Sequence, residues 1–230
     1  MILITGDTHG TIDISKVQKF FKGKESRFTK DDYLIILGDV GVCWDGGSSD
    51  QQVKSVLSSL PVTTLFIDGN HENHPLLNSY PEVKWHGGMV HEIAPDILHL
   101  MRGYVFNIQG YKFLALGGAS STDRTYRIEG VSWWPEELPD EEEMERAETS
   151  LSKVGWKVDY VLTHTAPYDV VSELNVEMYE PEMDFQYSLQ RIADQLDFRK
   201  WLFGHHHIDE KIDEQFIAVY NKFLGLKGKK

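Results

Sequence analysis

Five short apolar runs recur along the chain, each rich in Ile, Leu, Val, Tyr or Phe and followed by Gly or polar residues. Runs of this length and composition predict buried strands. Their hydrophobicity is continuous rather than alternating, which indicates that both faces of each strand are covered, as in a parallel sheet packed by helices. The five predicted strands occupy residues 1–5, 32–37, 63–68, 158–162 and 199–203.

The segments between these runs predict helices and a few more strands. Acidic residues follow Pro139 and Asp140, and a helix start favours them because the N-terminal end of the helix dipole is positive. Residues 88–118 predict strands and turns, with one strand over 111–118, and residues 212–224 predict a single terminal strand. The predicted helices are 14–23, 49–60, 140–154 and 182–196. Because no linker or repeat divides the chain, we predict one α/β domain over residues 1–230.

A polar motif stands at the end of each of the five predicted strands. The motifs are GDTHG (6–10), LGD (37–39), GNHE (69–72), LTH (162–164) and GHHH (204–207). In open α/β sheets, ligands bind outside the carboxyl ends of the strands, so we expect these motifs to meet in one crevice.

Spacing within the motifs supports a shared site. One residue separates Asp7 from His9 and His205 from His207, so extended backbone would turn both members of each pair to one side. A glycine precedes most of the motif ligands, and a residue without a Cβ allows close approach to a bound ion. The candidate ligands are Asp7, His9, Asp39, Asn70, His164, His205 and His207.

These oxygen and nitrogen ligands are enough for two divalent cations. Mixed imidazole, carboxylate and amide ligation without thiolate suits Mn, Fe or Zn and does not choose among them. Two such ions can bind a phosphoryl group and generate hydroxide at neutral pH.

From residue 7 to residue 207 the motifs resemble the pattern DxH, GD, GNH[DE], H and GHxH of the calcineurin-like metallophosphoesterase superfamily. The resemblance implies two mixed β-sheets packed as a sandwich and flanked by helices. It also implies in-line attack on phosphorus by a metal-bridging hydroxide, with His71 as general acid. By the same resemblance, Asp7, His9 and His207 would hold one metal, Asn70, His164 and His205 the other, and Asp39 would bridge the two.

The second motif separates the chain from one branch of that superfamily. GDTHG and GNHE are similar to the Ser/Thr protein phosphatase forms, but that branch carries GDxVDRG where this chain reads GDVGVCW (38–44). The missing Asp would orient the catalytic His, and the missing Arg would bind phosphate. Length and residues 120–150 look more like small bacterial and phage phosphoesterases. A Ser/Thr-type protein phosphatase and a non-catalytic metal-binding scaffold remain the alternatives.

Two further groups are candidates for contact with substrate. Arg124 and Arg127 lie in a polar loop that either folds over the metal crevice or stays at the surface, where its arginines pair with acids; we favour the second. Trp133 and Trp134 either form an aromatic lip near the metals or belong to an ordinary solvated segment. For Glu72, a supporting hydrogen bond and a solvated loop position are equally reasonable.

The other histidines and the lone cysteine carry no spacing that argues for chemistry. His206 lies between two candidate ligands and should point the opposite way. Cys43 is best explained as a small buried hydrophobe. We expect structural roles for His74, His86, His91 and His99.

Charge and composition limit the partners and the location. A formal net charge of −13 argues against long nucleic acids as partners, although bound metals would reverse the sign locally. We expect a small phosphorylated substrate, with nucleotides among the candidates, and the sequence leaves the oligomeric state open. Met1 opens directly into the first predicted strand, no apolar run approaches the roughly 20 residues that span a membrane, and one cysteine fits a reducing compartment. We therefore expect a cytoplasmic protein without a membrane partner.

Overall fold

The fold is built on two β-sheets in a computed structural model that describes residues 1–174 and 176–228. In spatial order, the first sheet of these described residues has β13 (Leu224–Leu226), β1 (Ile2–Thr5), β2 (Tyr33–Leu37), β3 (Thr63–Ile67), β6 (Ile97–Leu100), β5 (Gly88–Ala94) and β4 (Glu82–Trp85). The second has β11 (Glu210–Lys211), β12 (Phe216–Ala218), β10 (Lys200–Phe203), β9 (Tyr160–Thr163), β8 (Tyr111–Leu116) and β7 (Tyr104–Ile108). Each sheet has a parallel centre and antiparallel edges, so the predicted sandwich of two mixed sheets is confirmed.

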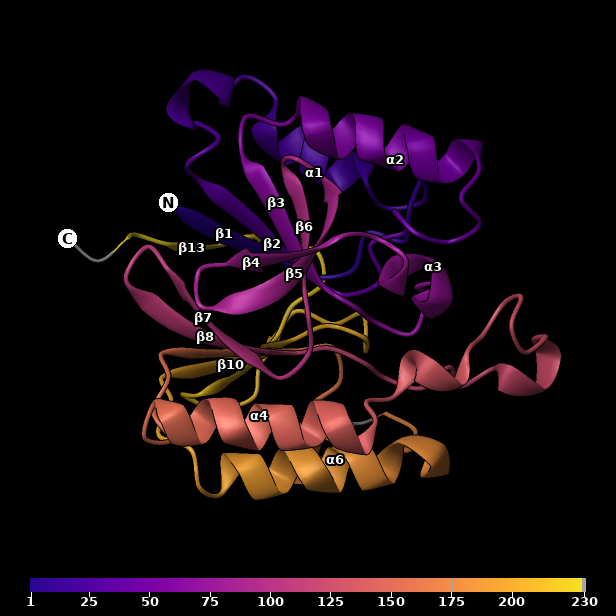
Figure 1. Cartoon of the computed structure of the whole chain (residues 1–230), viewed down its shortest axis with the longest axis vertical. Helices are drawn as coiled ribbons and strands as arrows, with labels where there is room; N and C mark the ends of the chain where they lie inside the picture. The colour runs from indigo at the N-terminus through magenta and orange to yellow at the C-terminus, as the bar shows by residue number, and fades with distance from the viewer. Residues whose placement is uncertain (175, 229–230) are drawn as a thin grey trace.

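Helices cover the outer face of each sheet, as Figure 1 shows. Helices α1 (Ser15–Phe21), α2 (Ser48–Ser59) and α3 (His74–Asn78) belong to the first half of the chain. Helices α4 (Glu141–Lys153), α5 (Tyr168–Glu173) and α6 (Glu180–Ala193) belong to the second. The four predicted helices correspond to α1, α2, α4 and α6, with ends that shift by up to three residues; α3 and α5 are too short to leave a clear periodicity.

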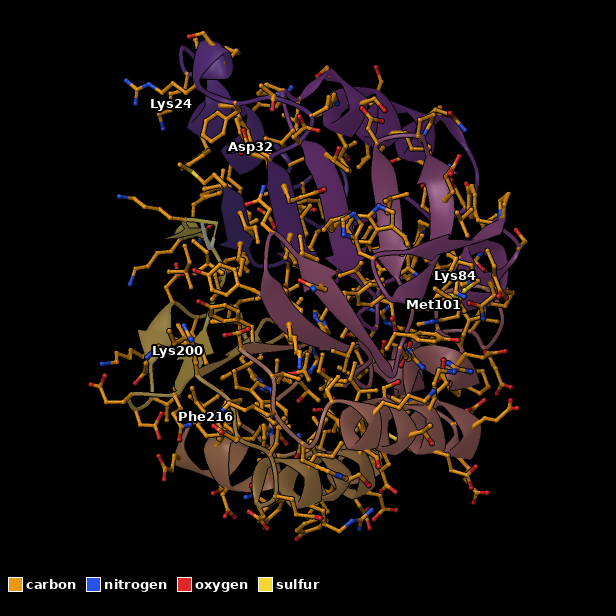
Figure 2. The ribbon with its side chains drawn as sticks, turned by 60° about the vertical axis from the view of Figure 1, so that its left-hand side comes forward. Lys24, Asp32, Lys84, Met101, Lys200 and Phe216 are labelled. Atoms are coloured by element: carbon orange, nitrogen blue, oxygen red, sulfur yellow. The ribbon has the colours of Figure 1, made fainter. Side chains whose placement is uncertain are left out.

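Three hydrophobic clusters fill the spaces between these four layers, and Figure 2 shows the side chains packed there. Along β1, Ile2 and Ile4 point between the sheets while Leu3 points to the helices on the outer face. On the other sheet Leu162 faces the space between the sheets, whereas Val161 faces the α4–α6 side. The strands are therefore apolar on both faces, which is the physical reason for the continuous apolar runs.

The C-terminal segment departs from the predicted single strand over 212–224, and that prediction is wrong. β12 pairs parallel with β10 in the second sheet, whereas β13 pairs antiparallel with β1 in the first. Between them the chain turns, and the Asp209 carboxylate accepts hydrogen bonds from the amides of Tyr220, Asn221 and Lys222 at 2.8–3.0 Å. Two polar residues, Asn221 and Lys222, interrupt the apolar run at this turn, and so short a break between apolar residues does not by itself distinguish two strands from one.

Among the described residues, none of the helices is long and apolar enough to cross a membrane.

Candidate metal centre

The motif side chains gather where β1, β2, β3, β9 and β10 end. A first group comprises Asp7, His9 and His207, whose potential ligand atoms lie within 4.8 Å of one another. The Asp7 Oδ2 atom is 3.2 Å from His207 Nε2 and 3.9 Å from His9 Nε2. Because β1 and β10 belong to different sheets, this group is assembled across the sandwich.

A second group comprises Asp7, Asp39 and His164, again with ligand atoms within 4.8 Å. All three residues are buried, and the Asp39 Oδ2 atom lies 3.5 Å from His9 Nε2 and 3.4 Å from His164 Nε2. Asp7 belongs to both groups, and the Asp39 carboxylate of the second group also lies close to His9 of the first.

Asn70 and His205 line the same cavity as Asp39 and His207, which measures about 390 Å³. The Asn70 side chain donates through Nδ2 to Ser121 Oγ at 3.3 Å, and its Oδ1 atom is buried without a hydrogen bond to the described residues. His205 Nε2 lies 3.4 Å from a carboxylate oxygen of Glu182, which leaves Nδ1 as the other ring nitrogen that could bind a metal.

The backbone at these positions is not extended, which corrects the geometric basis of the spacing argument. His9, Asp39, His205 and His207 have φ values of 40°, 50°, 63° and 52°. Residues other than glycine rarely adopt this left-handed region, and such strain gathers at functional sites where surrounding contacts enforce it. Here the amide of His9 donates to the carbonyl of Asp39 at 2.7 Å, which ties the two turns together.

The glycines of the motifs make room for neighbouring candidate ligands. A Cβ at Gly38, where φ is +92°, would collide with the ring of His164, and a Cβ at Gly204 would collide with the Asp7 carboxylate. Gly38 and Gly204 thus let side chains that follow different strands approach each other. This explains the motif glycines more specifically than close approach of the backbone to an ion.

Electrostatics at the site favour positive charge. Burial raises the pKa of the Asp39 carboxyl, but the neighbouring His164 and His71 rings outweigh it and hold this pKa well below its usual range. Burial lowers the pKa of His164, yet Asp39 and Asp7 raise it to about 10. The pKa of His9 is raised to about 9 by Asp39 against the effect of burial. A divalent cation in this field would displace these protons, because metal ligands must be deprotonated.

Several residues that the sequence did not single out orient the candidate ligands. His9 Nδ1 lies 2.9 Å from an oxygen of Asp13, which also accepts from the Tyr220 hydroxyl at 3.1 Å. The ring of Tyr220 stacks on His207 with a centroid separation of 4.7 Å. Carboxylates behind a histidine fix its tautomer and orientation. The spacing of four between His9 and Asp13 was a local signal, whereas Tyr220 had none.

His164 is oriented by a backbone contact, since its Nδ1 atom lies 2.6 Å from the carbonyl oxygen of Leu37. Its Nε2 atom is buried without a hydrogen bond to the described residues, as is Asn70 Oδ1. Buried polar atoms are almost always paired, so these two unpaired atoms are suited to bind a cation. The donor set of carboxylate, imidazole and amide is also suited to such an ion.

Glu72 lies beneath the site and is fully buried. One carboxylate oxygen accepts from the amide of Val40 at 2.6 Å, and the other accepts from the amides of Gly69 at 2.6 Å and Asp39 at 3.3 Å. Its carboxylate therefore joins the turn after β2 to the turn after β3. The alternative of a solvated loop position is wrong.

His71 and Arg127 face the same cavity as the candidate ligands. His71 Nε2 lies 4.0 Å from the Asp39 Oδ2 atom and 3.4 Å from an Arg127 guanidinium nitrogen. Burial lowers the pKa of His71, and the positive charge of Arg127 acts in the same direction, while Asp39 opposes it. Arg127 is anchored by Asp123 at 2.5 Å and by the carbonyl of Ser132 at 2.8 Å.

Arg124 is paired with an acid, as the second of the two alternatives for this loop predicted. Its guanidinium is 3.1 Å from the buried Glu137 carboxylate and lies over the Trp133 ring at 4.4 Å. Glu137 also accepts from the amide and hydroxyl of Ser121, the residue that receives the hydrogen bond from Asn70. Arg124 therefore supports Asn70 from behind rather than lining the cavity among the described residues.

The tryptophans are not arranged as an open lip. Trp134 is 3% exposed and packs edge-on against Trp44 at 5.5 Å, whereas Trp133 is covered by Arg124. The tryptophan beside the site is Trp44 instead, whose centroid is 6.1 Å from that of His71. Trp44 lies in the motif GDVGVCW but carried no signal of its own in the sequence.

The remaining histidines and Cys43 lie outside the candidate groups. His91 and His99 stack at 5.2 Å, and His99 contacts Asp68 within a buried network that also includes Arg102. Burial lowers the pKa of His206 to about 3. Burial also raises the pKa of the Cys43 thiol to about 12, which keeps it protonated.

The model of one family, the calcineurin-like phosphoesterases, matches residues 1–209 of the chain. The chain belongs to this family. At the family level it is a metal-dependent phosphoesterase, in agreement with the clustered carboxylates and imidazoles. The comparison with curated proteins gave no match.

Solved structures share the fold at low sequence identity. The phosphopantetheinyl hydrolase (PptH) of Mycobacterium tuberculosis is 16% identical with a TM-score of 0.52, and the match covers 95% of this chain and 89% of that one. The protein TT1561 of Thermus thermophilus is 13% identical with a TM-score of 0.48, over 95% of this chain and 87% of that one. The first likeness supports the fold of two mixed sheets.

Proposed function

We propose that this calcineurin-like phosphoesterase hydrolyses a phosphomonoester or phosphodiester with two divalent cations, of Mn, Fe or Zn type. The observation that carries the proposal is the position of Asp39. Its buried Oδ2 atom lies 3.5 Å from His9 Nε2, a candidate ligand of the first metal, and 3.4 Å from His164 Nε2, a candidate ligand of the second. A carboxylate so placed can be shared by two metal sites.

The residues that would hold the cations divide around Asp39. Asp7, His9 and His207 would hold one, and Asn70, His164 and His205 the other. The unpaired Asn70 Oδ1 and His164 Nε2 atoms support the second site. Of its three proposed ligands, His164 also belongs to the buried group with Asp7 and Asp39. When bound, two cations would polarise the phosphoryl oxygens and make water acidic enough to act as a nucleophile near pH 7.

His71 and Arg127 supply what the cations do not. The Arg127 guanidinium is positioned to donate to phosphate oxygens, and Asp123 and Ser132 preorganise it. His71 would donate a proton to the leaving oxygen from Nε2, the ring atom that faces both Asp39 and Arg127. Because the pKa of His71 is lowered from its usual value of 6.5, the fraction of His71 that carries this proton increases only as the pH falls below 6.5.

A small substrate fits the 390 Å³ cavity, and a nucleotide is one candidate. The alternative of a Ser/Thr-type protein phosphatase has less support, since residues 38–44 lack that branch's Asp and Arg, and Arg127 approaches His71 from another loop. The lone, buried Cys43 is consistent with a cytoplasmic location, which fractionation of the producing cells would test.

The test is hydrolysis of para-nitrophenyl phosphate and bis-para-nitrophenyl phosphate by the chelated and the Mn²⁺-loaded protein. Asp39→Asn should abolish Mn²⁺-dependent turnover, while Asp31→Asn, at an exposed aspartate, should leave it unchanged. His71→Ala should slow phenyl phosphate far more than para-nitrophenyl phosphate, because a poor leaving group depends more on general acid catalysis, which is worth about 10²–10⁴ in rate.

Undiminished turnover in Asp39→Asn would refute the site assignment. Full metal loading without turnover of either ester, across pH, would instead support a non-catalytic scaffold. The ratio of the two wild-type rates would decide between monoester and diester preference.

A further inference from the structure

A second cavity adjoins the candidate metal centre: His71 lines both this cavity and the 390 Å³ cavity, and the candidate ligand His9 lines the second one. It measures about 300 Å³, and the large apolar side chains that line it are Trp44 and Ile12. Among the described residues that line it, His9 and His71 are the titratable ones, so its far wall is uncharged. The first cavity is different, because carboxylates, imidazoles and Arg127 line it.

The Trp44 wall of this second cavity is held in place before any ligand arrives. The Trp44 amide donates to the buried Asp50 carboxylate at 2.8 Å, and its carbonyl accepts from the Asn73 side chain at 3.0 Å. The ring also packs at a right angle against the buried Trp134, with the centroids 5.5 Å apart, and Trp134 does not line the cavity among the described residues. Rigid aromatic walls bind flat groups at a low entropic cost.

His71 lies at the boundary between the two cavities. With phosphate beside Asp39 and Arg127, the ester oxygen would pass His71, and the rest of the leaving alcohol would enter the second cavity. The rings of Trp44 and His71 both line the second cavity, with centroids 6.1 Å apart and planes that differ by 32°.

We propose that the second cavity is a leaving-group subsite for an aromatic alcohol, one whose ring is joined to the ester oxygen directly or through one carbon. This inference rests on the proposed phosphoesterase activity and adds the class of substrate. The ring would lie against Trp44, with Ile12 closing the outer edge. Ile12 is 77% exposed, so covering it by a ligand removes apolar surface from water.

The experiment compares benzyl phosphate with ethyl phosphate on the Mn²⁺-loaded protein, since the two alcohols have similar basicity and differ by the ring. We expect a preference for benzyl phosphate in kcat/KM of about tenfold or more. Trp44→Ala and Ile12→Ser should each bring the ratio toward one, and Trp44→Phe should restore most of it. Ile128→Ser is the matched control, because Ile128 is 67% exposed and lines neither cavity among the described residues.

Calorimetric binding of benzylphosphonate and ethylphosphonate gives a second readout that does not require turnover. A wild-type preference that survives both Trp44→Ala and Ile12→Ser would overturn the subsite, as would equal affinity for the two phosphonates. If the wild-type protein hydrolyses neither ester but binds benzylphosphonate more tightly than ethylphosphonate, and Trp44→Ala removes that difference in affinity, the proposed activity is refuted and the subsite is supported. The Ile12→Ser variant keeps the test valid if Trp44→Ala fails to fold.

Discussion

Replacing Glu72 by Gln tests whether the floor of the site is built by one buried carboxylate. Its two oxygens accept the short bonds from Val40 and Gly69, both at 2.6 Å. A Gln side chain turns one oxygen into an amide donor, so either rotamer sets N–H against N–H at one of these positions. Loss of a hydrogen bond to a charged group costs about 1.5–3 kcal/mol, and the buried donor left unpaired adds to it. We expect a total loss of about 2–4 kcal/mol.

Chemical denaturation and calorimetry of the metal-free protein measure this loss. For a chain of this size, 1 kcal/mol lowers Tm by about 2–4 °C, so Glu72→Gln should melt roughly 10 °C lower. Its Mn²⁺ affinity should fall about 10–100-fold, because Asp39 and Asn70 stand on the two turns that Glu72 joins. Glu148→Gln, at an exposed position of α4, should change Tm little. Wild-type stability in Glu72→Gln would refute the argument.

Three further predictions concern other supports of the site. Asp13→Asn should weaken Mn²⁺ binding by about tenfold or more in calorimetry, because it removes the carboxylate behind His9. Arg127→Met should raise KM at little cost in Tm, whereas Arg124→Met should lower Tm because it removes the guanidinium partner of the buried Glu137 carboxylate. Burial lowers the pKa of His74 to about 3, so the unfolded chain takes up its proton from pH 6.5 downward while the folded chain does not. The free energy of unfolding should therefore fall by about 1.4 kcal/mol per pH unit between pH 6 and 4 through this residue, and His74→Gln should flatten that slope.

The sequence predicted the strands and the motif residues because both leave local signals. Each of the five strands that precede the motifs is a short, mainly apolar run, and each candidate ligand stands within a few residues of the end of such a strand. Most of the residues that orient those ligands leave no such signal; Asp13 and Glu72, which lie close to the motifs in sequence, are the exceptions. Glu182 in α6 and Glu137 before α4 look like surface acids in the sequence, but both are buried and bonded to partners far along the chain. Trp44 gains its position from contacts with Asp50 and Trp134 that only the folded chain provides.

The candidate site depends on the packing of the two sheets against each other. Asp7 and Asp39 follow strands of the first sheet, whereas His164 and His205 follow strands of the second. The contacts that join them cross the sandwich, as between His164 Nδ1 and the carbonyl oxygen of Leu37 at 2.6 Å, or the amide of His205 and Asp7 Oδ1 at 3.3 Å. Cations held by both sets of residues would link the sheets. They would raise the free energy of unfolding by RT ln(1 + [L]/Kd), where [L] is the free metal concentration and Kd its dissociation constant. For the same reason, a substitution between the sheets that shifts one layer against the other should disturb metal geometry before it unfolds the chain.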